Sequence, residues 1–191
     1  MSIAIEQSPV ASIGQGGYWL SPFDPALAER VANWVSNDDE LFWLAPKTIP
    51  PLTADKILNW PGIGSRPMFL RMNLSREPLG YLELNNMPGD HRHFWVGHCI
   101  IDPDHRGKGL GQVMIRLLLE EAFQHCRGQR VSLVVFPDNL PAIRCYQALG
   151  FRHVGWQSRY FPVRGDYYSM WHMAVDARSY RRAVRYDSLE A

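Results

Sequence analysis

The sequence predicts a single α/β domain built on a mixed, mostly antiparallel sheet of about seven strands, flanked by about four helices. Three strand-like runs separated by turn residues occupy the middle of the chain, which is typical of an antiparallel meander. A long helical pattern then lies between two strand-like runs within residues 93–136, and such a crossover requires a parallel strand pair. The 191 residues, with 46% hydrophobic content, are enough for one sizeable core.

The expected elements follow from hydrophobic periodicity and from helix caps such as Asp24 and Thr53. In chain order they are a strand over 18–23, helices over 24–38 and 53–60, strands over 66–73, 78–86 and 93–101, a helix over 110–126, a strand over 130–136, a helix over 139–150, and strands over 152–161 and 166–175. We expect a flexible lead-in over 1–16, the domain over 17–176 and a polar tail over 177–191.

Composition limits the classes of function. A formal net charge of +1 argues against a surface that binds nucleic acid or anionic membrane as a whole. There is no apolar run of ~18 residues and no basic segment ahead of an apolar run, so a cytoplasmic location is expected. Cys99, Cys126 and Cys145 are odd in number and form no CxxC pair. Reduced thiols are therefore expected, without a disulfide framework or a metal site.

The loop "RGKGLG" (106–111) stands between a strand-like run and a helix. It lacks the GxxxxGK[ST] string of nucleotide-binding loops, and a dinucleotide fingerprint would need glycine where Gln112 stands. Glycines still let backbone N–H groups approach an anion, and the following helix adds the positive end of its dipole. The loop therefore indicates a local phosphate site, with a flexible turn carrying solvated charges as the alternative.

The loop and a downstream motif together resemble the GNAT superfamily of N-acetyltransferases. The matching residues are Arg106, Gly109 and Gly111 in the loop, and Asn139, Tyr146, Gly150 and Phe151 in the order and spacing of the family's second motif. The resemblance covers residues 66–175 well and the N-terminal elements more loosely. The closing segment is similar to the branch that acetylates the N-termini of ribosomal proteins. The resemblance implies a GNAT-like fold in which the two parallel strands splay apart.

The resemblance also implies acetyl-CoA as the cofactor. Its pantetheine arm would bind between the splayed strands, against backbone groups of Cys99, Ile100 and Ile101, and its pyrophosphate against the loop that follows. The implied loop contacts are Arg106, Gly107, Lys108, Gly109, Leu110, Gly111 and Gln112. Asn139 would contact the pantetheine arm, and the same residue can cap the helix over 139–150.

The implied activity is acetyl transfer from acetyl-CoA to a primary amine by direct attack on the thioester. Tyr146 matches the general acid of the family, because a phenol with an ordinary pKa of about 10 keeps its proton at neutral pH. The neighbouring Cys145 points about 100° away around the helix, and no activating histidine is placed beside it, so it is interpreted as a packing residue.

The general base is less determined by the sequence. In the ribosomal-protein branch a glutamate lies five residues before the asparagine, and here that position is Val134. Glu83, an acid inside an otherwise apolar strand, is the residue we select. His98, His93 and a water chain remain alternatives.

The acceptor is expected to be a small amine or a peptide N-terminus. Aromatic residues that form either core packing or an apolar acceptor pocket are Trp43, Trp60, Trp95, Trp156, Tyr160, Phe161, Tyr167 and Tyr168. A non-catalytic acyl-CoA-binding or sensing domain is the main alternative function, and a nucleotide-binding regulator is a more distant one. No nucleic-acid or membrane partner is expected, and a homodimer is considered.

Overall fold

The structure, a computed structural model, describes residues 17–73, 75 and 77–181. Its elements, in chain order, are β1 (Tyr18–Pro22), the 3₁₀ turn η1 (Pro25–Leu27), α1 (Ala28–Ala32), α2 (Asp38–Leu44), α3 (Ala54–Leu58), β2 (Ser65–Met72), β3 (Pro78–Met87), β4 (Asp90–Val96), β5 (Ile100–Ile101), the 3₁₀ turn η2 (Pro103–His105), α4 (Leu110–Glu120), the π-helical turn η3 (Glu121–His125), β6 (Arg130–Val135), α5 (Leu140–Ala148), β7 (Arg152–Phe161) and β8 (Asp166–Asp176).

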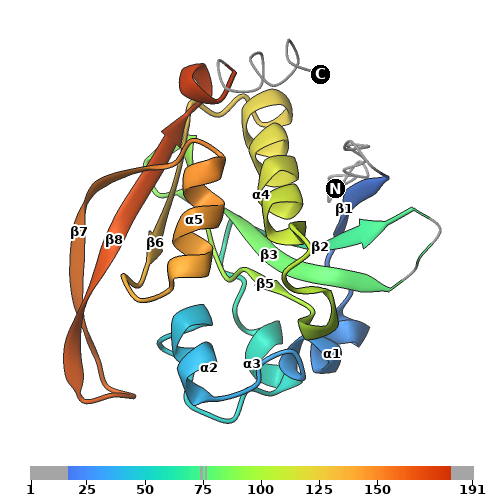
Figure 1. The fold of residues 1–191 in the computed structure, drawn as a ribbon, viewed down its shortest axis with the longest axis vertical. Coiled ribbons are helices and arrows are strands. Elements are labelled where there is room, and N and C mark those ends of the chain that lie inside the picture. The colour runs from blue at the N-terminus through green and yellow to red at the C-terminus, as the bar shows by residue number, and fades with distance from the viewer. Residues whose placement is uncertain (1–16, 74, 76, 182–191) are drawn as a thin grey trace, which may run out of the picture.

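One mixed sheet organises the molecule and confirms the predicted fold class. Its strand order is β1-β2-β3-β4-β6-β8-β7, with β5 beside β3. Neighbouring strands are antiparallel except β4 and β6, which run parallel from the pair His93–Arg130 to the pair Trp95–Ser132. Helices α4 and α5 lie side by side against the sheet, and α1, α2 and α3 gather at one end of it (Figure 1).

The parallel strands part after three residue pairs. The strand predicted over 93–101 is therefore wrong as one element, since it divides into β4 and β5 and raises the sheet to eight strands. Gly97 donates its N–H to the carbonyl of Glu83 at 2.9 Å. This bond keeps the chain after β4 next to β3, although the chain no longer pairs with β6 there. A Cβ at position 97 would lie 2.5 Å from Nδ2 of Asn85, so only glycine fits this close approach.

The N-terminal helices differ from the prediction. The helix expected over 24–38 ends at Ala32, and a separate helix, α2, follows. Asn37 caps α2, because its Oδ1 accepts hydrogen bonds from the N–H groups of Asp39 and Glu40 at 3.1 and 2.9 Å. The acidic first turn of α2 also complements the helix dipole. These cap and charge signals are present in the sequence and could have revealed the helix.

The C-terminal half follows the prediction closely. The strand expected over 152–161 is confirmed as β7, and the helix expected over 110–126 forms as α4 continued by the π-helical turn. After β8 the chain enters a helical turn in which Tyr180 is buried against Phe123, with ring centroids 5.5 Å apart. The lead-in over 1–16 and the tail beyond residue 181 lie outside the described residues. Among those described, no helix combines the length and apolarity needed to cross a membrane.

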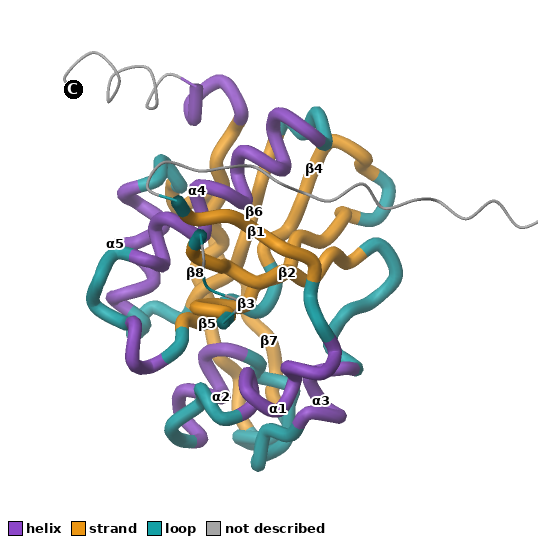
Figure 2. The backbone as a smooth tube through the Cα atoms, turned by 90° about the vertical axis from the view of Figure 1, so that its right-hand side faces the viewer, coloured by secondary structure: helices purple, strands orange, loops and turns teal. Residues whose placement is uncertain are grey.

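Figure 2, turned by 90° from Figure 1, shows α1, α2 and α3 grouped at one end of the strands, with β5 close to them. The chain leaves β5, passes through η2 and the glycine loop and enters α4 within ten residues, from Ile100 to Gly109. Thus the end of the parting strands and the amino end of α4 are held close together by a short connection.

Candidate active site

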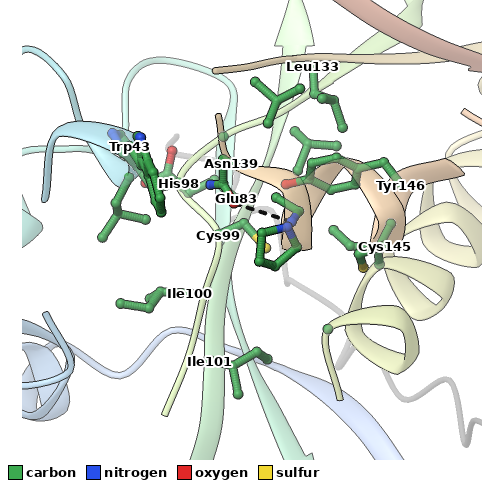
Figure 3. Close-up of a pocket in the computed structure, with 18 of the residues that line it drawn as sticks. Trp43, Glu83, His98, Cys99, Ile100, Ile101, Leu133, Asn139, Cys145 and Tyr146 are labelled. Carbon is green, nitrogen blue, oxygen red and sulfur yellow. Dashed lines mark hydrogen bonds and ion pairs between the residues drawn. The ribbon is translucent and has the colours of Figure 1, made fainter. Parts of the chain in front are cut away.

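A pocket of about 1260 Å³ opens where β4 and β6 part. Its walls come from residues 97–101 on one side, residues 133–136 on the other, the start of α4, helix α5, and the α2–α3 region. Figure 3 shows Tyr146 and Cys145 on one side of this space and Trp43 on the opposite side, with Ile100 and Ile101 along a wall between them. Every residue that the sequence analysis selected for the site lines the pocket except Lys108.

The glycine loop presents bare backbone to the pocket. Gly107 and Gly109 have left-handed φ values of +74° and +77°, and Gly109 is the N-cap of α4. A Cβ at either glycine would meet nothing within 4 Å, so space is left open beside the backbone. The five consecutive N–H groups from Gly107 to Gly111 have no acceptor within the part of the chain that the structure describes. Donors of this kind at a helix amino end suit a phosphate.

The cationic side chains of the loop are engaged elsewhere. The guanidinium of Arg106 pairs with Glu40 at 2.6 Å and donates to the carbonyls of Trp34 at 2.8 Å and Ile101 at 3.0 Å. The ammonium of Lys108 donates to the carbonyl of Asp104 at 2.9 Å. Arg106 therefore ties the loop to the N-terminal helices, and the donors that face the pocket are those of the backbone.

Arg144 is a pocket residue that the sequence analysis did not select. It lies on α5, is exposed, and has no ionic or hydrogen-bond partner among the described residues. Arg144 lies two residues before Tyr146 and five residues after the capping Asn139. This position on the same helix could have indicated it. It brings an unpaired positive charge to the pocket wall.

Tyr146 lies on α5 in a nearly dry environment. Burial raises its pKa well above 10, and the neighbouring thiols of Cys99 and Cys145 add to the effect. Its hydroxyl lies beside the thiol of Cys99. Burial also raises the pKa of Cys99 to about 12 and that of Cys145 to about 11. Both thiols therefore stay protonated at neutral pH and are poor nucleophiles, and Tyr146 holds its proton.

Asn139 acts as the N-cap of α5. Its Oδ1 accepts a hydrogen bond from the N–H of Ala142 at 3.2 Å, so the capping role expected from the sequence is confirmed. Its side-chain amide also belongs to the pocket wall, and Gly111 on α4 faces α5 closely enough that a Cβ would lie 3.5 Å from Sγ of Cys145. Because Gly111 has no Cβ, the start of α4 approaches α5 closely at Cys145.

Glu83 and His98 form a pair at the wall of the pocket. Oε1 of Glu83 lies 3.0 Å from Nδ1 of His98 and accepts a hydrogen bond from the hydroxyl of Tyr81 at 2.7 Å. The imidazole of His98 stacks on the indole of Trp60, with centroids 4.1 Å apart and planes at 14°. The side chain of Glu83 is 3% exposed and that of His98 is 25% exposed. His98 is therefore the more accessible member, and Glu83 stands behind it.

The remaining base candidates lie in other surroundings. His93 does not line the pocket, and its Nε2 lies 2.7 Å from Oγ of Ser132. Burial, together with Arg130, lowers the pKa of His93. Val134 lines the pocket as an apolar residue and so provides no carboxylate at the position where the ribosomal-protein branch has one.

The aromatic residues selected from the sequence fall into three groups. Trp43, Trp60 and Trp95 line the pocket. Phe161 and Tyr168 pack with Phe42, Phe136 and Met170 between α2 and the β7–β8 hairpin. The other three are exposed large side chains on that hairpin, namely Trp156, Tyr160 and Tyr167.

Cys99, Cys126 and Cys145 are free cysteines. Among the described residues, no group of three or more histidine, cysteine, aspartate or glutamate side chains is placed to hold a metal ion.

The fold and the pocket define a protein that can hold an extended, phosphate-bearing ligand between two parting strands. The chain belongs to the acetyltransferase (GNAT) family, whose model matches residues 18–151.

Similar proteins act on different acceptors. Over 71 residues the chain is 41% identical to the N-alpha-acetyltransferase RimI of Mycobacterium tuberculosis, covering 37% of this chain and 42% of the relative. Over 61 residues it is 36% identical to the spermine/spermidine N(1)-acetyltransferase of Bacillus subtilis, covering 32% and 40%. The chain thus spans less than half the length of these curated relatives. They do not single out one branch, so the expected ribosomal-protein branch is not confirmed.

A solved structure agrees over nearly the whole domain. The spermidine N-acetyltransferase of Vibrio cholerae, solved in complex with CoA and spermine, superposes with a TM-score of 0.71 at 20% identity. The match covers 87% of this chain and 99% of that one. At this identity it supports the fold.

Proposed function

We propose that the protein is an acetyl-CoA-dependent N-acetyltransferase that acts on a primary amine. The main support is that one pocket is lined by the glycine loop apart from Lys108, by Tyr146 and by the Glu83–His98 pair. Its volume of about 1260 Å³ exceeds the ~300–1,000 Å³ typical of a site for one drug-sized ligand. It therefore has room for two reactants.

The residues present fit acetyl-CoA. The backbone of residues 107–112 at the start of α4 would hold its pyrophosphate, with the charge of Arg144 nearby. β5 pairs only with β3, so its other edge, at Ile100 and Ile101, faces the pocket and offers backbone groups to the pantetheine amides together with Cys99. Asn139 borders the same channel.

When bound, acetyl-CoA supplies an acetyl group on a thioester, and in the transfer the C–S bond breaks, a C–N bond forms, one proton leaves nitrogen and one reaches sulfur. His98 provides the proton acceptor. Because Nδ1 of His98 faces the carboxylate of Glu83, it carries hydrogen, which leaves the lone pair on Nε2 for the amine proton. Glu83 orients the ring, and the Tyr81 hydroxyl in turn donates to the carboxylate of Glu83. The base thus belongs to the pair, rather than to Glu83 alone as selected from the sequence.

Tyr146 supplies the other proton. Its raised pKa keeps the hydroxyl protonated across the neutral and mildly alkaline range. The hydroxyl lies beside Cys99, where the strands part, and both residues line the pocket. A protonated phenol here can donate to a departing thiolate.

The test is release of free thiol from acetyl-CoA in the presence of a panel of primary amines. Tyr146→Phe is expected to lower kcat roughly 100-fold, while CoA continues to raise the melting temperature of the variant. Unchanged turnover in this variant would refute the acid assignment. If no amine yields thiol although CoA protects the wild type, the acyl-CoA-sensing alternative is favoured; protection by ATP and not by CoA would favour the nucleotide-binding regulator.

A further inference from the structure

Each carboxylate of the described pocket lining already has a partner. Asp39 pairs with Nη2 of Arg164 at 2.5 Å. Glu40 pairs with Arg106 at 2.6 Å and accepts a hydrogen bond from the N–H of Ser36 at 2.8 Å. With Glu83 committed to His98 as described above, no acidic side chain of the described pocket lining is left without a partner.

This charge arrangement disfavours acceptors with several ammonium groups. Each additional ammonium needs a carboxylate or another acceptor to offset its lost hydration. Here Asp39 and Glu40 are held by arginines, and Glu83 is held by His98. An amine that fits this pocket therefore carries one amino group, which lies near His98, and no second ammonium group.

Three indoles line the pocket. Trp43 is on α2, Trp60 follows α3 and Trp95 is on β4. Trp43 is 38% exposed and lies on the same side as His98 in Figure 3. The orientation of Trp60 is fixed, because its indole N–H donates to Oγ1 of Thr48 at 3.1 Å. Flat apolar walls of this kind suit an aromatic or bulky apolar body, and they disfavour the charged form of an amine held against them.

A second cavity, of about 730 Å³, lies between α2 and the β7–β8 hairpin and is lined by Phe42 and Arg164 among others. Arg164 at the hairpin donates to the carbonyl of Asp38 at 3.2 Å and lies over the ring of Phe42, 4.9 Å from its centroid. Phe42 in turn packs on Phe136 and Phe161, with centroids 4.9 and 5.3 Å apart. Phe42 lines the second cavity and Phe136 lines the pocket, so their contact bounds the pocket on this side. This wall favours an acceptor with a compact body.

We infer that the acceptor is a small monoamine with an aromatic or bulky apolar body, which rests on Trp43, Trp60 and Trp95 while its nitrogen meets His98. This inference rests on the proposed function and narrows its substrate class.

The test compares acceptors at one acetyl-CoA concentration, by thiol release and by mass of the product. The probes are tryptamine and 2-phenylethylamine, spermidine, kanamycin, and an octapeptide with N-terminal alanine. The expected kcat/KM for the two arylalkylamines exceeds that for each other probe by at least about 10-fold. A preference for spermidine, kanamycin or the peptide would overturn the inference while upholding acetyl transfer. Thiol release with none of the amines would overturn both this inference and the proposed function.

Variants of the indole wall give a second measurement. Trp43→Ala is expected to raise KM for tryptamine roughly 5–10-fold and to leave KM for acetyl-CoA unchanged. Trp156→Ala is the matched control, because this exposed indole on β7 does not line the pocket. Trp43→Phe, which retains a ring, should recover most of the loss if Trp43→Ala proves unstable. Equal tryptamine kinetics for wild type, Trp43→Phe and Trp43→Ala would contradict the inferred role of the wall.

Discussion

The two ends of the pocket are built from different chemical groups. The cofactor end, defined as residues 99–101, 107–112, 133–136, 139 and 145, offers mainly backbone N–H and C=O groups. The acceptor end, defined as Trp43, Trp60, Trp95 and the Glu83–His98 pair, offers side chains from several elements. A site made of backbone depends on local conformation, whereas a site made of side chains depends on how distant elements pack. Glycines and turn geometry are enough to maintain the backbone site, whereas the side-chain site changes whenever one of its side chains is substituted.

The largest expected effect is at the acceptor end. His98→Ala should lower kcat by roughly 100-fold or more, because it removes the proposed proton acceptor, with CoA binding unchanged in a thermal-shift titration. His93→Gln is the matched control, since His93 lies outside the pocket and glutamine can still bond Ser132. If His98→Ala and His93→Gln lost kcat to a similar extent, the Glu83–His98 pair would have no special role in catalysis.

At the cofactor end, the buried thiols should make stability depend on pH. Their folded-state pKa values of about 12 for Cys99 and about 11 for Cys145 lie above those of an unfolded chain. The folded state therefore binds more protons than the unfolded state at alkaline pH, and stability falls as pH rises past about 8.5. Urea unfolding should show a loss of roughly 1–2 kcal/mol per thiol between pH 8 and pH 10. Cys145→Ala should flatten this dependence, and an unchanged slope would argue that the thiol is hydrated.

Two glycines test whether the backbone of the loop binds the cofactor. Gly109 and Gly89 have φ values of +77° and +80°, and a Cβ would meet nothing within 4 Å at either. Gly109→Ala and Gly89→Ala should therefore destabilise the fold similarly, by about 1–2 kcal/mol. Only Gly109→Ala should weaken CoA binding, by roughly 10-fold, measured by calorimetry. Equal CoA affinities of the two variants would place the phosphate elsewhere.

The smallest expected effect concerns a helix cap at the cofactor end. Asn139→Ala and Thr53→Ala each remove the side-chain cap of a helix, so each should cost about 1 kcal/mol in the free energy of unfolding. If Asn139 also contacts the pantetheine arm, its variant alone should show weaker CoA binding in the same titration. CoA affinity that is identical in the two variants would leave Asn139 with a capping role only.

The strand and helix order could be predicted because it depends on local signals. Alternating and helical periodicity located β7, β8 and α4, and a cap identified the start of α5. The helix α2 was missed because its start lies inside what reads as one helical stretch, although Asn37 and the acidic residues after it mark a new one. The break after β4 was missed because it depends on Gly97 meeting β3, a contact between separate strands.

The sequence by itself determined the sheet, the glycine loop and the placement of a phenol on the helix after β6, since periodicity, left-handed glycines and caps act over a few residues. Only the tertiary structure decided that Glu83 stands behind His98, 15 residues away, and that Arg164 neutralises Asp39 across 125 residues. It also turned Arg106 away from the loop and toward Trp34. Such contacts follow from sheet register and packing between elements far apart in the chain, and no local pattern of residues encodes them.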